Sequence, residues 1–211
     1  MGTIRNGGNG AFSGKAGSFI GSSWKNIDYI KGIPKLSKKA ASPKQLEQRH
    51  RFTIALAFLT PIKDILNMGY ASKAGNKSTG ANMALQDILG NAITGEYPAL
   101  AIDPSKVKIS KGSLDSPKGV SVVRNGANIT VNWYVNLHSS ANVDDKALIV
   151  AYNPLNDLFL IFENAGTRGL GTADLVMPAE FATEDFVLYF FFQQRDKSRC
   201  SDSLYLYAAA S

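Results

Sequence analysis

The spacing of hydrophobic residues divides the 211-residue chain into three regions. Up to about residue 41, single aromatic and aliphatic residues are spread among glycine, serine and lysine. From residue 42 to residue 104 apolar residues recur every three or four positions, which indicates helices, and from residue 105 short runs rich in Val, Ile, Tyr and Phe indicate strands. We therefore predict an α+β protein with an extended N-terminal arm (residues 1–41), a helical hairpin (residues 42–104) and a C-terminal antiparallel β-sandwich (residues 105–211).

The first helix is predicted to begin at "SPKQ", where Ser42 is the N-cap and Gln45 the third helical residue of a capping box. Pro61 should stop or kink it, and Gly69 should end the turns that follow. A second helix is predicted over residues 81–93. A hairpin of this size cannot bury both of its faces, so it must pack on the β region, the arm or other copies of the chain. Apolar residues that follow the period of the first helix are Leu46, Phe52, Ile54, Ala55, Leu56, Phe58 and Leu59.

The β region contains seven or eight short apolar runs separated by turn-forming residues. In "NITVNWYVN", Ile129, Val131 and Trp133 alternate with polar residues, which predicts one buried and one exposed face. This number of strands in about 105 residues is typical of an immunoglobulin-like or fibronectin type III-like sandwich, with Trp133 as the central core aromatic residue. The runs are "VKIS", "GVSVV", "NITVNWYVN", "KALIVAYN", "LFLIFE", "ADLVM", "DFVLYFFFQQ" and "SLYLYA".

The glycine-rich stretch "GGNGAFSGKAG", residues 7–17, has the composition of a phosphate-binding loop. If Gly14 and Lys15 are placed on the Gly-x-x-x-x-Gly-Lys-Ser/Thr pattern, however, Asn9 occupies the first glycine position and Ala16 occupies the hydroxyl position. We therefore interpret the stretch as part of an extended arm whose side chains contact another surface. The predicted contact residues are Phe12, Lys15, Phe19, Trp24, Lys25, Tyr29 and Lys31.

Positive charge is concentrated in the N-terminal quarter. Residues 1–51 contain ten Lys or Arg and two acidic residues, whereas the net charge of the whole chain is +6. Such a segment is suited to nucleic acid or to an acidic protein partner, although a solvated basic leader has the same composition. Residues predicted to contact nucleic acid are Arg5, Lys35, Lys38 and Lys39.

The residues of catalytic and metal sites are sparse. The chain has a single cysteine, Cys200, which we interpret as a turn residue, and two histidines, His50 and His138, which we expect at the surface. The acidic pairs 144–145 and 184–185 are interpreted as turn residues. No catalytic residue, metal site or cofactor is therefore predicted. We also expect no membrane span and no signal peptide, and hence a cytoplasmic protein at synthesis.

The combination of "FSGKAG", "GSSWK" and the Gln45, Arg49 and Phe52 pattern, followed by "SPKGV" before the sandwich, resembles an uncharacterised family of Bacteroidetes proteins, a domain of unknown function. The layout is also loosely similar to that of phage-type structural proteins. The family resemblance implies no activity and no catalytic residues.

Three functions remain open from the sequence. The first is a non-enzymatic structural protein that forms homo-oligomers through its arm, such as a component of a virion or another assembled particle. The second is a nucleic-acid-binding protein that uses the basic arm. The third is an immunoglobulin-like module that binds carbohydrate or protein through exposed Tyr134, Tyr152 or Tyr205.

Overall fold

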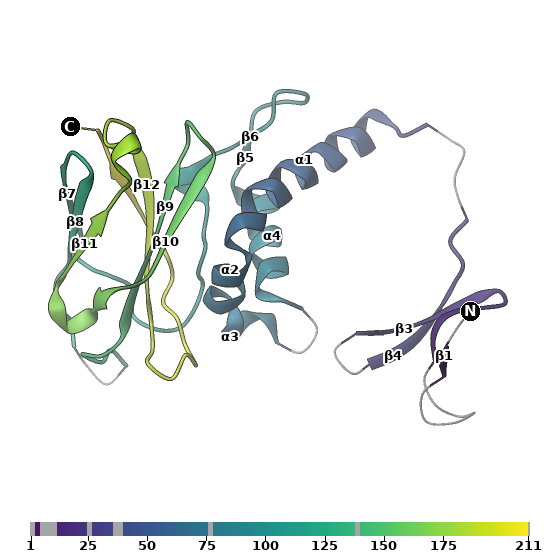
Figure 1. Cartoon of the computed structure of the whole chain (residues 1–211). Helices are drawn as coiled ribbons and strands as arrows, with labels where there is room; N and C mark the ends of the chain where they lie inside the picture. The colour runs from purple at the N-terminus through teal and green to yellow at the C-terminus, as the bar shows by residue number, and fades with distance from the viewer. Residues whose placement is uncertain are drawn as a thin grey trace. The chain divides into compact units, whose positions relative to one another are not determined.

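A computed structural model describes residues 3–4, 12–24, 27–35, 40–75, 78–137 and 140–210. The chain forms two compact units, residues 1–42 and residues 43–211. We call the first unit the arm and the second the body (Figure 1). The predicted Arg5, Lys25, Lys38, Lys39 and His138 lie outside the described residues.

Within the arm, the predicted extended segments are strands of one antiparallel sheet, ordered as in the chain. A two-residue turn at Gly17, whose φ is 58°, joins the second strand to the third. Gly21 in the third strand is required by close packing, because a Cβ there would clash with the backbone oxygen and the ring of Phe12. The strands are β1 (Thr3–Ile4), β2 (Phe12–Ala16), β3 (Phe19–Trp24) and β4 (Ile27–Gly32).

The helical part of the body begins at Pro43 as predicted, is interrupted by a 3-10 turn at Pro61, and reaches Gly69. The last helix begins at Gly80, where the Thr79 side chain accepts a hydrogen bond from the backbone of Asn82 at 3.2 Å. The helices are α1 (Pro43–Leu59), η1 (Thr60–Ile62), α2 (Lys63–Gly69), α3 (Ala71–Ala74) and α4 (Gly80–Asn91), and a small hairpin, β5 (Ile93–Thr94) and β6 (Ala101–Ile102), and η2 (Pro104–Lys106) follow.

The predicted apolar face of the first helix is only partly buried. Ala55, Phe58 and Leu59 lie in the core of the body, whereas Phe52 and Leu56 are 44% and 42% exposed. Since α1 is apolar around most of its circumference near its C-terminal end, the periodicity does not identify the buried side.

The C-terminal part of the body is an antiparallel β-sandwich, as predicted. Its seven strands form a three-stranded sheet, ordered β11-β8-β7, and a four-stranded sheet, ordered β10-β9-β12-β13, which is the strand arrangement of a fibronectin type III-like sandwich. Trp133 is buried between the sheets, 5.0 Å from the ring of Phe190. The strands and short helices are β7 (Ser121–Asn125), β8 (Asn128–Asn132), β9 (Lys146–Asn153), β10 (Leu158–Thr167), η3 (Arg168–Leu170), β11 (Thr172–Val176), η4 (Ala179–Phe181), β12 (Phe186–Gln193) and β13 (Leu204–Ala208).

The run "VKIS", residues 107–110, was predicted as a strand, and this prediction is wrong. Val107 and Ile109 are buried, but the segment is irregular, and side chains bind several of its backbone groups. The Ile109 N–H donates to Ser203 Oγ at 3.1 Å. Alternation of apolar residues therefore identified the burial of this segment but not its conformation.

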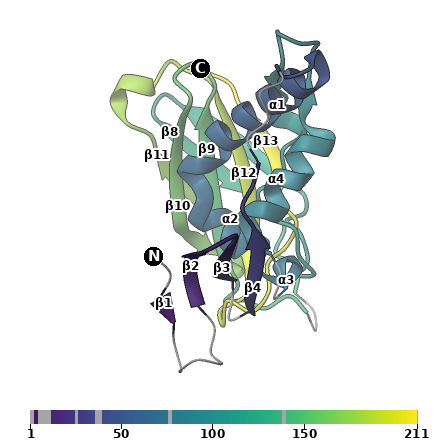
Figure 2. The same ribbon diagram turned by 90° about the vertical axis from the view of Figure 1, so that its right-hand side faces the viewer.

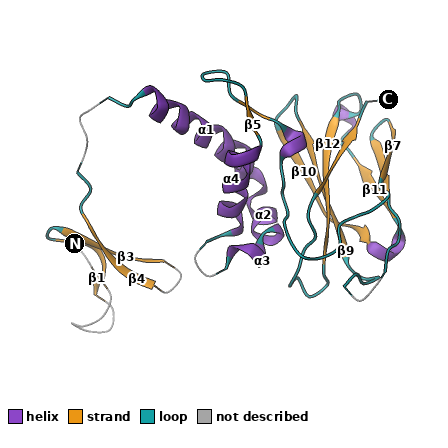
Figure 3. Cartoon of the chain, turned by 180° about the vertical axis from the view of Figure 1, so that it is seen from behind, coloured by secondary structure: helices purple, strands orange, loops and turns teal. Residues whose placement is uncertain are grey.

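The helices pack on the outer face of the four-stranded sheet, so the body has three layers (Figures 1 and 2). The two faces of β12 contribute to different cores. Tyr189 and Phe191 pack against the helices, whereas Phe190 and Phe192 pack against the three-stranded sheet. The continuous apolar sequence of this strand, "FVLYFFFQ", follows from burial on both faces. Figure 3 shows the helices on one side of this sheet and β7 and β11 on the other.

Candidate functional site

Strand pairing in the arm sorts the predicted contact residues onto two faces. Lys15 of β2 pairs with Ile20 of β3, which in turn pairs with Lys31 of β4. Ser22 pairs with Tyr29, so the tyrosine lies on the same face. Trp24, two residues further along β3, also lies there. We call this side, formed by Lys15, Ile20, Trp24, Ile27, Tyr29 and Lys31, the aromatic–basic face.

The opposite side, which we call the phenylalanine face, consists of Phe12, Ala16, Phe19 and Ile30. The rings of Phe12 and Phe19 meet edge to face at 6.0 Å. Phe12 also covers Gly21, which explains why a side chain at that glycine would clash. The two phenylalanines predicted as contact residues are therefore separated from Lys15, Trp24, Tyr29 and Lys31 by the thickness of the sheet.

Apolar side chains on both faces of the arm are exposed. Phe19 is 43% exposed and Ile30 65% exposed on one face, and Trp24 is 47% exposed on the other. Lys31 Nζ lies 6.0 Å from the centre of the Tyr29 ring, and Lys35, predicted to contact nucleic acid, is exposed beyond β4. The structure thus groups the described arm residues into two surfaces, and their roles as contacts stay predictions.

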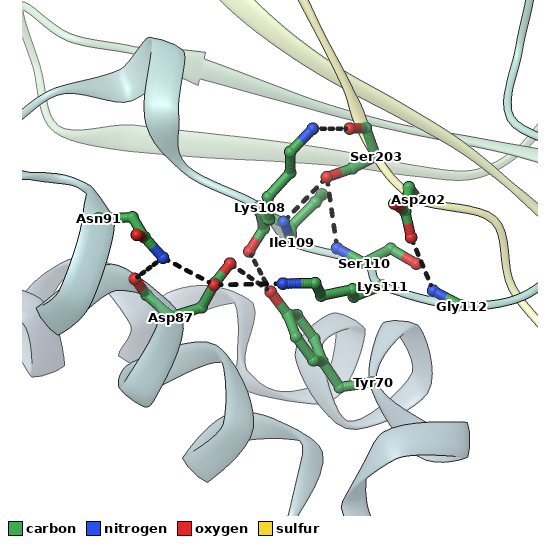
Figure 4. Close-up of polar contacts among 10 residues, drawn as sticks. All are labelled: Tyr70, Asp87, Asn91, Lys108, Ile109, Ser110, Lys111, Gly112, Asp202 and Ser203. Carbon is green, nitrogen blue, oxygen red and sulfur yellow. Dashed lines mark hydrogen bonds and ion pairs between the residues drawn. The ribbon is translucent and has the colours of Figure 1, made fainter.

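The body contains a polar cluster that the sequence did not reveal, centred on Tyr70 and Asp87 (Figure 4). The Tyr70 hydroxyl lies 3.0 Å from the Lys108 carbonyl oxygen and 3.3 Å from Asp87 Oδ2. Asp87 Oδ1 accepts hydrogen bonds from Asn91 Nδ2 at 3.0 Å and from Lys111 Nζ at 3.4 Å. The cluster joins α2 and α4 to the irregular segment before the sandwich, and it lies beside a cavity of about 430 Å³ lined by Tyr70, Lys73, Met83, Gln86, Asp87, Asn91 and Lys111.

The chemistry of this cluster favours a structural role. Burial and the neighbouring Asp87 raise the pKa of the Tyr70 hydroxyl far above its usual range, so the phenol stays protonated and donates. Both oxygens of Asp87 face hydrogen-bond donors. These contacts hold the segment that enters the sandwich against the helices, and none of them presents an activated nucleophile.

Asp145 was predicted as a turn residue, and the structure corrects this prediction. It is fully buried, and its Oδ2 binds Arg168 Nε at 2.9 Å. The Arg168 guanidinium, itself buried, lies 3.9 Å from the centre of the Phe192 ring and donates to the Asp115 carbonyl oxygen at 2.9 Å. The two residues are 23 positions apart, so no local pattern could have paired them.

Of the other acidic residues in these pairs, Asp144 lies in an exposed turn as predicted, Glu184 is half-buried at a bend, and Asp185 is exposed directly before β12. Asp144 is within 3.4 Å of Arg195 at the surface. Glu184 accepts hydrogen bonds from the Asn153 and Asn156 side chains. Asp185 accepts one from the Tyr207 hydroxyl at 2.6 Å, and this bond lowers the pKa of the carboxyl.

Cys200 was predicted as a turn residue, and this prediction is wrong, because it forms an isolated β-bridge with Gln193. It is 4% exposed in the core between the helices and the sheet, and burial raises the pKa of its thiol to about 11. A thiol in this environment stays protonated and is a poor nucleophile. His50, by contrast, is half-buried and packs edge to face against Tyr97 at 5.8 Å.

The tyrosines proposed as contacts of the sandwich differ in exposure. Tyr134 is 74% exposed, but Tyr152 is only 8% exposed because Phe58 of α1 packs against its ring at 5.0 Å. Tyr205 is half-buried beside the same core. The prediction that Tyr152 contacts a ligand is therefore wrong, since the helical layer covers that face of the sandwich.

Two further features bear on binding and location. Within the described ranges, no group of three or more His, Cys, Asp or Glu side chains could hold a metal ion. The continuous helical segment Pro43–Gly69 is long and apolar enough to cross a membrane by length and composition alone. Core helices of water-soluble proteins pass the same test, and this segment contributes buried residues to the core of the body.

The fold and these surfaces define an α+β protein with a C-terminal β-sandwich, a covering helical layer and a separate N-terminal sheet. Residues 11–207 match a family described as a family of unknown function, DUF6266, and the chain belongs to that family. The resemblance identified from "FSGKAG" and "GSSWK" to a domain of unknown function is thereby confirmed.

No match was found among curated proteins. The fn3 domain of human contactin 1 is a similar solved structure, with 14% sequence identity and a TM-score of 0.30, over 56% of this chain and 94% of that one.

Proposed function

We propose that this protein is a non-enzymatic structural protein that self-associates through its arm. The observation that carries the proposal is the exposure of apolar side chains on both faces of one small sheet, with Phe19, Trp24 and Ile30 each more than two-fifths exposed. Exposed apolar residues that gather on a surface mark interaction sites in proteins. A second copy of the chain would cover this surface without any other component.

The sheets of the body are covered more completely than the sheet of the arm. The four-stranded sheet of the body is covered on one face by helices and on the other by the second sheet. The outer face of the three-stranded sheet is mixed, because the Thr130 hydroxyl donates to Asp174 at 2.7 Å while Val123 and Val176 are 50% and 69% exposed. The arm differs in that exposed apolar residues lie on both faces of its sheet.

Sedimentation velocity of the full chain over a range of concentrations tests the proposal. We expect oligomers whose proportion rises with concentration and falls in Phe19→Ser or Trp24→Ser, which each remove apolar surface from one face. The matched control is Leu155→Ser, because Leu155 is 78% exposed in a loop of the body. A full chain that is monomeric at every concentration would contradict the proposal.

Negative-stain electron microscopy of the same samples distinguishes the forms of assembly. Closed particles of uniform size would favour the virion-type component predicted from the sequence. Small oligomers of fixed size would restrict the function to a structural subunit.

The aromatic–basic face favours a second candidate function, the binding of single-stranded nucleic acid. Lys15 and Lys31 flank Ile20 in one row across the sheet, and Trp24 and Tyr29 lie on the same face. Exposed rings stack on bases while lysines meet phosphates, an arrangement common to proteins that bind single strands without sequence preference.

Fluorescence anisotropy with a labelled single-stranded oligonucleotide tests this second function. Binding should weaken steeply as salt rises, because neutralised phosphates release counterions. Combined Lys15→Ala and Lys31→Ala should reduce both the affinity and its salt dependence, whereas Lys118→Ala, an exposed lysine of the body, should change neither. Binding that is absent or insensitive to salt would contradict this function.

A further inference from the structure

β4 forms one edge of the arm sheet. Among the residues that the structure describes, no strand pairs with its outer side, and all six of its residues are exposed. Proteins protect edge strands from pairing with other chains by proline, bulges, very short length or charged side chains, above all lysine. β4 pairs with β3 in unbroken register from Ile27 to Gly32 and contains no proline, and its two charged residues, Asp28 and Lys31, limit the registers in which another strand can pair.

The pairing with β3 determines which backbone groups face outward. The Ile33 N–H donates to the Ser18 carbonyl oxygen at 3.3 Å, so these two residues form a hydrogen-bonded pair. Because hydrogen-bonded residues alternate along an antiparallel strand, the odd-numbered residues of β4 direct their N–H and C=O groups toward β3. Asp28, Ile30 and Gly32 therefore direct theirs toward the open edge.

A second copy of β4 can meet this edge in few registers. Two copies related by a two-fold axis pair antiparallel with equivalent faces on the same side. An axis at Asp28 would oppose two carboxylates, and an axis at Lys31 would oppose two ammonium groups, and both arrangements are destabilising. An axis at Ile30 opposes Ile30 to itself, Asp28 to Gly32 and Tyr29 to Lys31.

The register centred on Ile30 also pairs more of the outward-facing backbone groups of β4 than the register centred on Tyr29. It pairs every outward-facing residue of the strand, whereas an axis at Tyr29 leaves Gly32 beyond the pairing. It places the Lys31 ammonium group of each copy across from the Tyr29 ring of the other, which favours a cation–π contact. It also joins the two Ile30 side chains, each 65% exposed in one chain, on the phenylalanine face.

We propose that two copies of the chain pair antiparallel along β4 with their two-fold axis at Ile30, which joins the two arms into one continuous sheet. The inference rests on the proposed self-association and specifies how two copies meet at one edge of the sheet. Edge pairing extends the sheet and does not itself cover the faces on which Phe19 and Trp24 are exposed. Main-chain hydrogen bonds supply the affinity, and the exclusion of the Asp28 and Lys31 registers supplies the specificity.

Cysteine crosslinking of the full chain tests the register. In an antiparallel hydrogen-bonded pair the two Cα atoms are about 5.5 Å apart, which is within the range of a disulfide. Ile30→Cys should therefore form a covalent dimer under mild oxidation, at about ten times the yield of either control variant. In Asp28→Cys the two residues are offset by about 14 Å along the strands, and in Tyr29→Cys by about 7 Å. The unchanged chain is the background control, because Cys200 is buried.

Each outcome of this experiment has one reading. A dominant Ile30→Cys crosslink supports the inference, and a dominant Tyr29→Cys or Asp28→Cys crosslink overturns the register. If none of the three variants crosslinks although sedimentation still shows oligomers, pairing along β4 is wrong while self-association stands. If the unchanged chain is monomeric, both the inference and the proposed function fail.

Discussion

The arm and the body differ in how far their β-sheets are buried. In the body, β9 and β12 are buried on both faces, because helices cover one side and a second sheet covers the other. In the arm, a sheet of four strands leaves Phe19, Trp24 and Ile30 exposed. The difference shows that apolar content does not decide stability by itself, since a sheet also needs a layer to cover it. Under the proposed function, further copies of the chain would cover the two faces of the arm sheet.

The largest expected difference between the two regions comes from removing one phenylalanine from each. Phe190 is fully buried beside Trp133, so Phe190→Ala should lower the free energy of unfolding of the body by about 4 kcal/mol. Phe19→Ala in the arm should leave this free energy unchanged and reduce self-association instead. Chemical denaturation followed by Trp fluorescence and circular dichroism measures the first effect. If both substitutions lowered the free energy of unfolding of the body equally, the proposed difference between arm and body would be wrong.

The buried ion pair gives a somewhat smaller effect within the body. Asp145→Ala leaves the buried Arg168 guanidinium without its carboxylate and should cost about 3 kcal/mol of unfolding free energy. Asp144→Ala, one residue earlier, breaks an exposed contact with Arg195 and should cost less than about 0.5 kcal/mol. Denaturant titration of both variants measures the difference. Similar values for the two would show that the Asp145 pair contributes no more than a surface contact.

Two glycines test the close packing of the arm. Gly21→Ala would place a Cβ against Phe12 and distort the sheet, so we expect about tenfold weaker self-association, equivalent to about 1.4 kcal/mol. Gly32→Ala meets no atom of the same chain within 4 Å, but Gly32 opposes Asp28 of the second copy in the proposed pairing, so we expect a loss of association smaller than that of Gly21→Ala. Sedimentation equilibrium of both variants measures the association constants, and the unfolding transition of the body should not move in either. A larger loss for Gly32→Ala would contradict the packing described for Phe12.

The smallest effect concerns the polar cluster that holds the sandwich to the helices. Tyr70→Phe removes the hydroxyl that contacts the Lys108 carbonyl oxygen and should lower the unfolding free energy of the body by about 1 kcal/mol. Tyr207→Phe removes an exposed hydroxyl that donates to Asp185 and should have little effect. Thermal unfolding monitored by circular dichroism compares the two. If Tyr207→Phe proved the more damaging, the cluster around Asp87 would not be the tie between the layers.

Local signals in the sequence were enough for most of the body. Pro43, Pro61 and Gly69 mark the start, the interruption and the end of the first helical segment, because each limits the backbone in a defined way. The alternation around Trp133 correctly predicted a sandwich with that residue in its core. By contrast, the position of the helices on the sheet is a long-range property. The continuous apolar run of β12 signals burial on both faces but does not say what covers them.

The candidate surfaces were less predictable because they depend on strand register. The sequence indicates that Lys15, Trp24, Tyr29 and Lys31 belong to one basic and aromatic segment. Their gathering on one face, away from Phe12 and Phe19, follows only from the turn at Gly17 and the pairing that it imposes. The ion pair of Arg168 with Asp145 was not predicted either, because only the fold brings these two residues together.

The most direct test of the account compares the full chain with a chain that begins at residue 42. Sedimentation velocity measures the oligomeric state of both, and circular dichroism with thermal unfolding checks that the body remains folded. We predict concentration-dependent oligomers for the full chain, and a folded monomer with an unchanged melting temperature for the shortened one. A shortened chain that still forms the same oligomers would contradict the claim that the arm is the element of self-association.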